Sequence, residues 1–268
     1  MQLDKILASQ PYLFATFLLS IRLSAVFLAT PILSVAQMPG VVRILLILVV
    51  SLALSMGISP EQAGAIASDD FPSLLFASAS ELALGVLLSL GILIAFGAIS
   101  IAGRLLDIQI GFGIGQVFDP ISRQSLPILT TVFNQLAIVL FFTLNGHHAL
   151  LRGLALSLQY FPLGRAWPIN ASYSVILRQV GALFSLGFSL AAPIVFCILL
   201  LELALGVVAR NLPQMNMFTM GIPVKIAIGL ATLAIWHTGF GGIMSRIYGS
   251  IYLGWEDLFQ LQAMREGV

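Results

Sequence analysis

Charged residues are scarce in this 268-residue sequence, where Asp, Glu, Lys and Arg together make up 9%. A soluble domain usually carries about 25% charged residues, because its surface must be solvated. Hydrophobic residues account for 59% of the chain. The shortage of charge excludes an ordinary water-soluble protein and predicts a chain whose main solvent is not water.

An excess of either sign of charge is also missing. Twelve Lys and Arg stand against eleven Asp and Glu, which leaves a formal charge of +1. The sequence therefore has no basic field that would attract a nucleic-acid backbone, and no acidic tail. We expect no nucleic-acid partner.

Cysteine is limited to Cys197, which cannot form a disulfide within the chain. It lies in the apolar run 191–200, where a small buried hydrophobe is the simplest interpretation. The sequence also lacks a Gly-x-Ser-x-Gly nucleophile elbow. The adjacent His147 and His148 would project about 100° apart on a helix, and no Cys, Asp or Glu follows four residues later. We predict no metal site, no cofactor, no catalytic residue and no enzyme activity.

Long intervals without any charge are abundant, and several reach the roughly 20 residues that a helix needs to cross a bilayer. Backbone amides in hydrocarbon must be paired within their own segment, so such intervals favour helices. The sequence predicts an all-α polytopic membrane protein with hydrophobic blocks at about 12–33, 41–58, 73–102, 126–160, 172–209 and 218–250.

Two of these blocks are too long for one simple crossing. As a straight helix, the block 172–209 would extend about 57 Å, against about 30 Å of hydrocarbon. We expect a kinked or broken helix there, or a hairpin, with Pro193 as the cause. Charge bias gives no consistent orientation, since the connection 59–72 is acidic whereas 145–171 carries arginines. Six simple spans are therefore an unsatisfactory picture.

Alternating glycines mark the segment from Gly111 to Pro120. A nucleotide-binding glycine loop would need a strand before it and a helix after it, and no strand is predicted here. Two interpretations stay open: a flexible apolar obstruction in an aqueous path, since hydrophobic constrictions exclude water, or an ordinary interhelical loop. The apolar side chains and the acidic residue that ends the segment are Phe112, Ile114, Val117, Phe118 and Asp119.

Five ionisable residues lie inside or at the ends of the apolar blocks, where a charge needs a partner, a watery cavity or the membrane interface. Pairing or snorkelling within the chain is one interpretation, and polar contact with another subunit is the other. A carboxylate at a broken helix would also suit a secondary transporter, although no second carboxylate near Glu202 supports a proton relay. The five residues are Glu81, Arg178, Glu202, Arg210 and Lys225.

Several motifs together resemble one known family. They are the stretches Arg22 to Leu33, Gly103 to Pro120 with its Val117-Phe118-Asp119-Pro120 end, Phe141 to His147, Leu203 to Gly206, and Ala209 to Asn216 followed by Gly221-Ile222-Pro223. Each is weak alone, but they follow one another in the family's order over nearly the whole chain. The sequence resembles the FliR family of the flagellar type III export gate, whose injectisome relatives are the SctT proteins.

The resemblance implies one export-gate domain over residues 1–268, with long kinked helices and helical hairpins arranged as a FliP-like part followed by a FliQ-like hairpin. It implies a non-enzymatic channel subunit that joins FliP-like and FliQ-like subunits, with FlhB and FlhA as further partners, and that conducts unfolded protein substrates. The implied place is the bacterial inner membrane at the flagellar basal body. A virulence injectisome subunit is the alternative within the family.

The family's plug loop maps onto the stretch from Gln109 to Arg123. Phe112, Ile114, Val117 and Phe118 would then seal the closed channel. This sequence has Ile114 and Val117 where other members have phenylalanine, so we expect the seal to depend mainly on Phe112 and Phe118.

Overall fold

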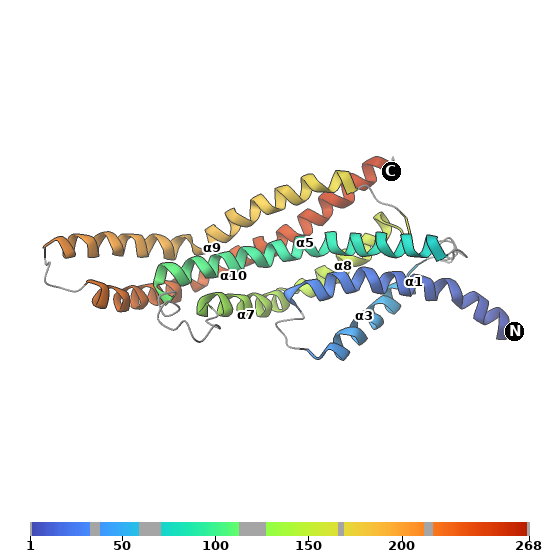
Figure 1. The fold of residues 1–268 in the computed structure, drawn as a ribbon, viewed down its shortest axis with the longest axis horizontal. Helices are drawn as coiled ribbons and strands as arrows, with labels where there is room; N and C mark the ends of the chain where they lie inside the picture. The colour runs from blue at the N-terminus through green and yellow to red at the C-terminus, as the bar shows by residue number, and fades with distance from the viewer. Residues whose placement is uncertain are drawn as a thin grey trace. The chain divides into compact units, whose positions relative to one another are not determined.

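The computed structural model describes residues 2–32, 38–58, 71–112, 127–165, 169–211 and 217–266. Within these ranges all the regular elements are helices, which confirms the predicted all-α class (Figure 1). The longer helices are α1 (Gln2–Ala29), α3 (Gly40–Ser55), α5 (Phe71–Ile110), α7 (Ile128–Thr143), α8 (Gly146–Tyr160), α9 (Ile169–Asn211) and α10 (Met217–Glu266).

The chain folds into two compact units. Unit 1 comprises residues 1–93, 145–179 and 250–268, and unit 2 comprises 94–144 and 180–249. The helices α5, α9 and α10 each contribute residues to both units.

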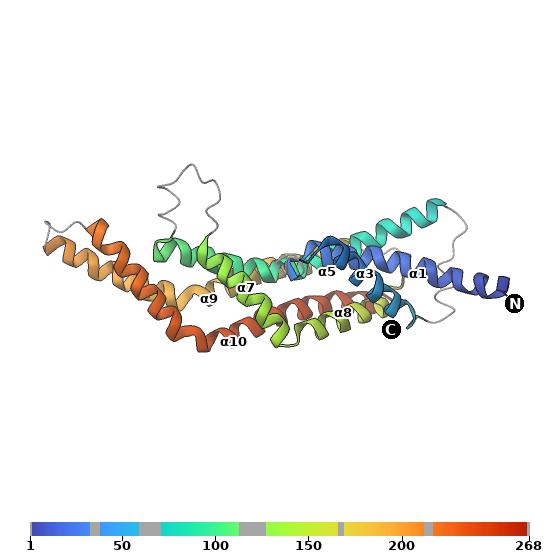
Figure 2. The same ribbon diagram turned by 90° about the horizontal axis from the view of Figure 1, so that it is seen from below.

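Unit 1 is assembled on α1. Figures 1 and 2 both draw α3 beside α1, and the Thr16 hydroxyl on α1 donates to the Ser55 hydroxyl oxygen on α3 at 2.9 Å. Pro39 precedes α3, and its carbonyl accepts the Val42 N–H at 3.0 Å, so the proline starts the helix without losing a helical hydrogen bond. The core of unit 1 includes Leu18, Leu19, Leu23 and Val26 of α1 with Leu84, Leu88 and Ile92 of α5.

A glycine sets the distance between α1 and α5. A Cβ added at Gly85 would lie 2.5 Å from the carbonyl oxygen of Arg22 and 2.7 Å from the Cβ of Ala25. The two backbones can approach this closely only because Gly85 has no side chain, as its small-residue spacing with Ser89 predicts. Gly181, which has the same kind of spacing, has nothing within 4 Å.

Unit 2 has an aromatic centre. The rings of Phe96, Phe141 and Tyr248 come from α5, α7 and α10, with centroids 5.6–6.4 Å apart. The Tyr248 hydroxyl donates to the carbonyl oxygen of Ala137 at 2.5 Å, which satisfies its one buried polar group. A Cβ at Gly187 would lie 2.7 Å from the carbonyl oxygen of Ala98, so α9 also packs directly on α5.

The block 172–209 is one helix. α9 continues through Pro193, and Figure 1 draws it as a single ribbon that bends along its length. Proline removes one backbone hydrogen bond and bends a helix. Of the predicted alternatives, α9 is therefore a kinked helix and not a broken one. A hairpin is formed instead by the end of α9 and the first part of α10, which run side by side in unit 2. The ion pair of Glu202 and Lys225 joins these two helices.

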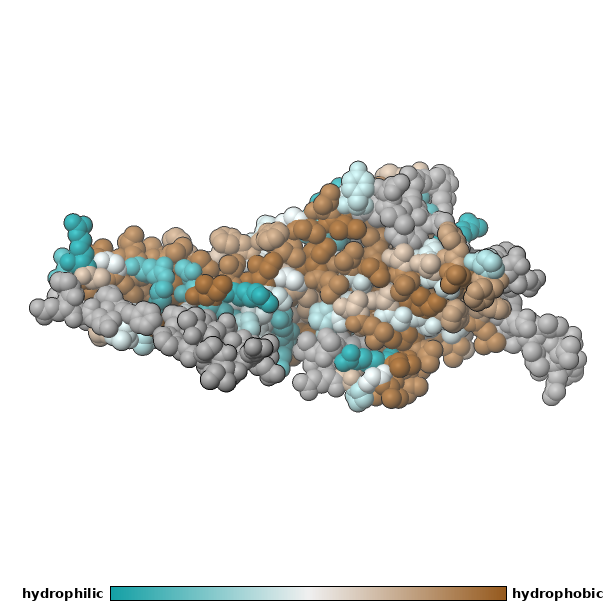
Figure 3. All heavy atoms as spheres, viewed as in Figure 1, coloured by the Kyte–Doolittle hydropathy of each residue, from teal (hydrophilic) through white to brown (hydrophobic). Residues whose placement is uncertain are grey.

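The helices suit a membrane. Among the described residues, four candidate spans are long and apolar enough, and α7 with α8 gives a fifth if this bent pair is one span. The four are Tyr12–Ala29, Phe71–Ile110, Tyr173–Asn211 and Thr219–Met264. Large apolar side chains stay exposed, such as Leu203 at 71% and Ile235 at 79%, and brown covers most of the coloured surface in Figure 3. Such a surface must be covered by lipid or by other proteins.

Candidate functional site

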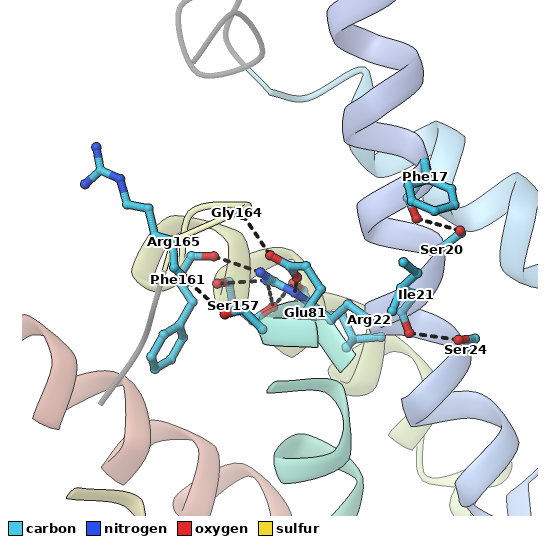
Figure 4. Close-up of polar contacts among 12 residues, drawn as sticks. Phe17, Ser20, Ile21, Arg22, Ser24, Glu81, Ser157, Phe161, Gly164 and Arg165 are labelled. Atoms are coloured by element: carbon cyan, nitrogen blue, oxygen red, sulfur yellow. Dashed lines mark hydrogen bonds and ion pairs between the residues drawn. The ribbon is translucent and has the colours of Figure 1, made fainter. Parts of the chain in front are cut away.

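A buried ion pair lies at the centre of unit 1. Arg22 of α1 and Glu81 of α5 point toward one another in Figure 4, with Arg22 Nε 2.6 Å from Glu81 Oε2. Each side chain is 1% exposed. Opposite charges this far from water stabilise a fold only when their remaining polar atoms are also satisfied.

The segment after α8 satisfies those atoms. Arg22 Nη1 donates to the carbonyl and hydroxyl oxygens of Ser157, at 3.3 and 3.1 Å, and Nη2 donates to the carbonyl oxygen of Phe161 at 2.9 Å. The other carboxylate oxygen of Glu81 accepts the N–H of Gly164 at 3.0 Å, in a turn where Gly164 has a φ of 75° (Figure 4). A guanidinium is also favoured beside the carbonyl-rich C-terminal end of a helix. The ion pair thus joins α1, α5 and α8.

A second buried charge lies in unit 2, three residues before the end of α5. The Asp107 carboxylate accepts the N–H groups of Leu129 and Thr130 at 2.9 and 3.0 Å, and the Thr130 hydroxyl at 2.8 Å. These amides belong to the first turn of α7, where backbone N–H groups have no partner within their own helix. Asp107 therefore caps α7 from another helix, although it is only 2% exposed.

Asp107 is the last of a row of contacts between α5 and α7. The Ser100 hydroxyl donates to Asn134 Oδ1 at 3.0 Å, and a Cβ at Gly103 would lie 2.6 Å from the Cα of Thr130. Residues 100, 103 and 107 recur at helical spacing, so they share one face of α5. This row holds together α5 and α7, the helices that precede and follow the glycine-spaced segment in the sequence.

The structure describes only the beginning of that segment. Gly111 has a φ of 102° and ends α5, in a left-handed conformation that a glycine adopts without strain. Phe112 follows it and is half-buried. The other predicted plug residues, Ile114, Val117, Phe118 and Asp119, lie outside the described residues.

The five predicted polar contact residues lie in three kinds of place. Glu81 is enclosed with Arg22, whereas Glu202 and Lys225 pair with each other at 38% and 25% exposure. Arg178 Nη1 lies 3.1 Å from Asp257 Oδ2 on the surface of unit 1, and Arg210 is exposed in the last turn of α9. Whether any of them contacts another subunit stays a prediction.

No group of three or more His, Cys, Asp or Glu side chains suited to a metal occurs among the described residues. His147 and His148 do lie together at the start of α8, with ring centroids 4.1 Å apart. Asn145 precedes them with a φ of 58°, which places it in the left-handed region that asparagine tolerates better than most residues. Asn145 therefore lies in the turn between α7 and α8, and the Gly-His-His that follows it forms the first turn of α8.

A family model described as "Bacterial export proteins, family 1" matches residues 13–251. The chain belongs to this family. The match extends from α1 into α10 and so includes the ion pair, the Asp107 cap and the glycine-spaced segment. The resemblance inferred from the motifs is confirmed, and the chain is a member of the FliR family of export proteins.

Curated relatives share much of the chain. The flagellar biosynthetic protein FliR of Bacillus subtilis (strain 168) is 32% identical over 227 residues, which is 83% of this chain and 86% of the relative. FliR of Escherichia coli (strain K12) is 29% identical over 219 residues, 80% of each chain. The secretion system apparatus protein SsaT of Salmonella typhimurium is 32% identical over 143 residues, 53% of this chain and 55% of the relative. Their names describe biosynthesis and secretion apparatus, and none names an enzyme reaction.

Sequence reasoning did not single out two residues of this site. Arg22 is separated by 59 residues from its partner, yet it shares with Glu81 the property of being a lone charge beside a long apolar interval. Pairing such isolated opposite charges would have suggested the contact. Asp107 resembles an ordinary solvated residue near a helix end, and no local signal indicates that it is buried.

Proposed function

We propose that this FliR-family member is a structural subunit of the flagellar type III protein export gate, in the bacterial inner membrane at the flagellar basal body. The observation that carries the proposal is the family match over residues 13–251, together with two relatives named as flagellar biosynthetic proteins that align over at least 80% of the chain. The four to five candidate spans support a place in the membrane.

We further propose that residues 1–268 act as one export-gate domain that joins FliP-like and FliQ-like subunits, with FlhB and FlhA as further partners. The exposed apolar side chains of α3 and α9 support this, because they would be buried against neighbouring subunits that together with this chain surround the channel. The chain should co-purify with FliP-like and FliQ-like proteins from membranes. Recovery of the chain alone, folded and stable, would count against the proposed assembly.

The proposed gate is the glycine-spaced loop, whose apolar residues Phe112, Ile114, Val117 and Phe118 would exclude ions until a substrate segment enters. Asp119 with Pro120 would end the loop. The cap by Asp107 supports this role, because it fixes α5 to α7, the helices before and after the proposed gate in the sequence.

Glycine at those four apolar positions should raise ion leak through the assembled complex. Glycine at Leu144 is a matched control, because Leu144 is also apolar and exposed and lies outside the regular helices, between α7 and α8. Unchanged conductance of the fourfold variant, with the complex intact, would remove the plug assignment while leaving the family role in place.

A virulence injectisome subunit is the second candidate. The alignment with SsaT over 53% of the chain favours it, although the alignments with FliR proteins extend further. Deleting the gene and scoring motility against secretion of virulence proteins separates the two. Loss of flagella alone supports the flagellar role.

We propose that Glu202, Lys225, Arg178 and Arg210 contribute polar contacts to neighbouring subunits, since each is at least part-exposed beside apolar surface. Glu81 would take part only through its pair with Arg22. The secondary-transporter alternative has less support, because α9 runs unbroken past Glu202 and Lys225 neutralises that carboxylate. Coupled uptake of a solute by the chain alone would revive it.

A further inference from the structure

Unit 1 contains a cavity that has no part in the proposed gate. Its volume is about 320 Å³, and it lies between α8 and the C-terminal part of α10. This is within the range of about 300–1,000 Å³ that is usual for small-molecule sites. Its lining includes Arg152, Leu156, Tyr252, Trp255, Glu256 and Phe259.

The floor of this cavity is apolar. Trp255 and Phe259 are 2% and 5% exposed. The Trp255 Nε1–H donates to the carbonyl oxygen of Leu88 at 3.1 Å, and the Tyr252 hydroxyl donates to that of Gly146 at 2.8 Å. Because these polar atoms are already bonded within the unit, the small part of each ring that reaches the cavity is apolar. A hydrocarbon chain fits such walls, whereas water would find few partners.

Two opposite charges line the same cavity without neutralising each other. Arg152 on α8 and Glu256 on α10 are both exposed, which places them at its mouth. Neither forms a hydrogen bond or an ion pair with any other residue in the part of the chain that the structure describes. His148 lies four residues before Arg152, on the same face of α8, and also lines the cavity. An occupant with both an anionic and a cationic group would match this mouth.

The surface beside the mouth is apolar. Leu253 and Leu151 are 64% and 37% exposed, and this part of α10 belongs to the candidate span Thr219–Met264. Charged side chains next to lipid-facing surface extend toward the headgroup layer, and Trp and Tyr are enriched at that level. The cavity thus combines a hydrocarbon environment with two headgroup-type charges.

We propose that this cavity binds one phospholipid whose headgroup carries a phosphate and a primary ammonium, as in phosphatidylethanolamine. The phosphate contacts Arg152, the ammonium contacts Glu256, and an acyl chain lies against Trp255 and Phe259. The proposal does not depend on the plug loop or on which secretion system the chain serves.

Native mass spectrometry of the assembled, detergent-purified complex tests the proposal. After delipidation, the complex is offered phosphatidylethanolamine or phosphatidylglycerol with the same acyl chains in mixed micelles. We expect one retained phosphatidylethanolamine and about tenfold weaker retention of phosphatidylglycerol, which has no ammonium for Glu256. Equal retention of the two lipids, or retention of neither, would overturn the assignment.

Variants separate the lipid site from general surface charge. Arg152→Gln and Glu256→Gln should each weaken phosphatidylethanolamine retention about tenfold, because one charge-assisted contact is lost. Arg246→Gln is the control, since Arg246 is exposed on α10 and does not line the cavity. Unchanged retention in both cavity variants contradicts the proposal.

Leu156→Trp tests the cavity without altering charge. Leu156 is 38% exposed, so the larger ring can enter the cavity without disturbing the core. The complex should remain assembled and lose the lipid. A lipid that stays bound, or crosslinking from L156C to a neighbouring subunit in place of lipid, refutes the assignment.

Discussion

The two units each contain an ion pair between helices, and the two pairs differ in their access to solvent. Arg22 and Glu81 of unit 1 are each 1% exposed and bond three further residues of the α8 end. Lys225 and Glu202 of unit 2 are 25% and 38% exposed. A buried pair must be completed by its own chain, because one unpaired charge there is costly. Each charged side chain of a half-exposed pair can exchange its partner for water or for a group of another protein.

Removing one member of the buried pair should have the largest effect. Arg22→Met removes the donor to Glu81 Oε2 and to the carbonyl oxygen of Phe161 and leaves the buried carboxylate without its cation, and we expect a loss of about 3–5 kcal/mol in the free energy of unfolding. The level of the protein in membranes and the thermal unfolding of the purified complex measure it. The exchange Arg22→Glu with Glu81→Arg should not rescue the fold, since Arg22 also donates to Ser157 and Phe161. A rescue by that exchange would contradict the view that the α8 end completes the pair.

The glycine beside this pair should rank next. Gly85→Val places a side chain against the Arg22 carbonyl and Ala25, where a Cβ would lie 2.5 and 2.7 Å from them. Overpacking of this kind costs about 1–3 kcal/mol, and here it also displaces the backbone that carries Arg22. Gly181→Val is the matched control, because Gly181 also lies within an apolar helix, and a Cβ added there would have no neighbouring atom within 4 Å. Equal loss of thermal stability in both variants would mean that α1 and α5 do not depend on this close approach.

Asp107 extends the comparison, because it is a buried charge that has no paired cation among the described residues. Asp107→Asn replaces one accepting oxygen by an N–H₂ group that faces the α7 amides, and leaving a buried donor unsatisfied costs about 1–3 kcal/mol. Amide hydrogen exchange should speed up at Leu129 or Thr130, since one of these two N–H groups loses its acceptor. Asn134→Leu removes the Ser100 contact one turn away and should leave those two amides protected. Unchanged exchange in Asp107→Asn would show that the cap does not hold α7.

The parts of this site that sequence could predict are those with a local signal. Intervals without charge predict the long helices, because the bilayer tolerates few unpaired charges. Glu81, Glu202 and Lys225 stand out for the same reason. The sequence does not indicate which charge pairs with which, since Arg22 meets Glu81 across 59 residues and Lys225 meets Glu202 across 23, so both contacts are set by packing. The kink at Pro193 was predictable, because proline lacks the backbone N–H. The choice between a kink and a hairpin depends on packing against other helices, which the sequence does not indicate.

The half-exposed pair should give the smallest effect on stability. Lys225→Gln removes an interaction worth about 0.2–1 kcal/mol at such exposure, so the free energy of unfolding should hardly change. Its effect should appear in assembly instead, because Glu202 then exposes an unneutralised carboxylate beside the apolar face of α9. Thermal unfolding and the yield of co-purified partner subunits measure the two effects separately. If Lys225→Gln lowered stability as much as Arg22→Met, the difference in exposure would not decide the role of the two pairs. If it changed neither quantity, the Glu202–Lys225 pair would be an ordinary surface contact with no part in assembly.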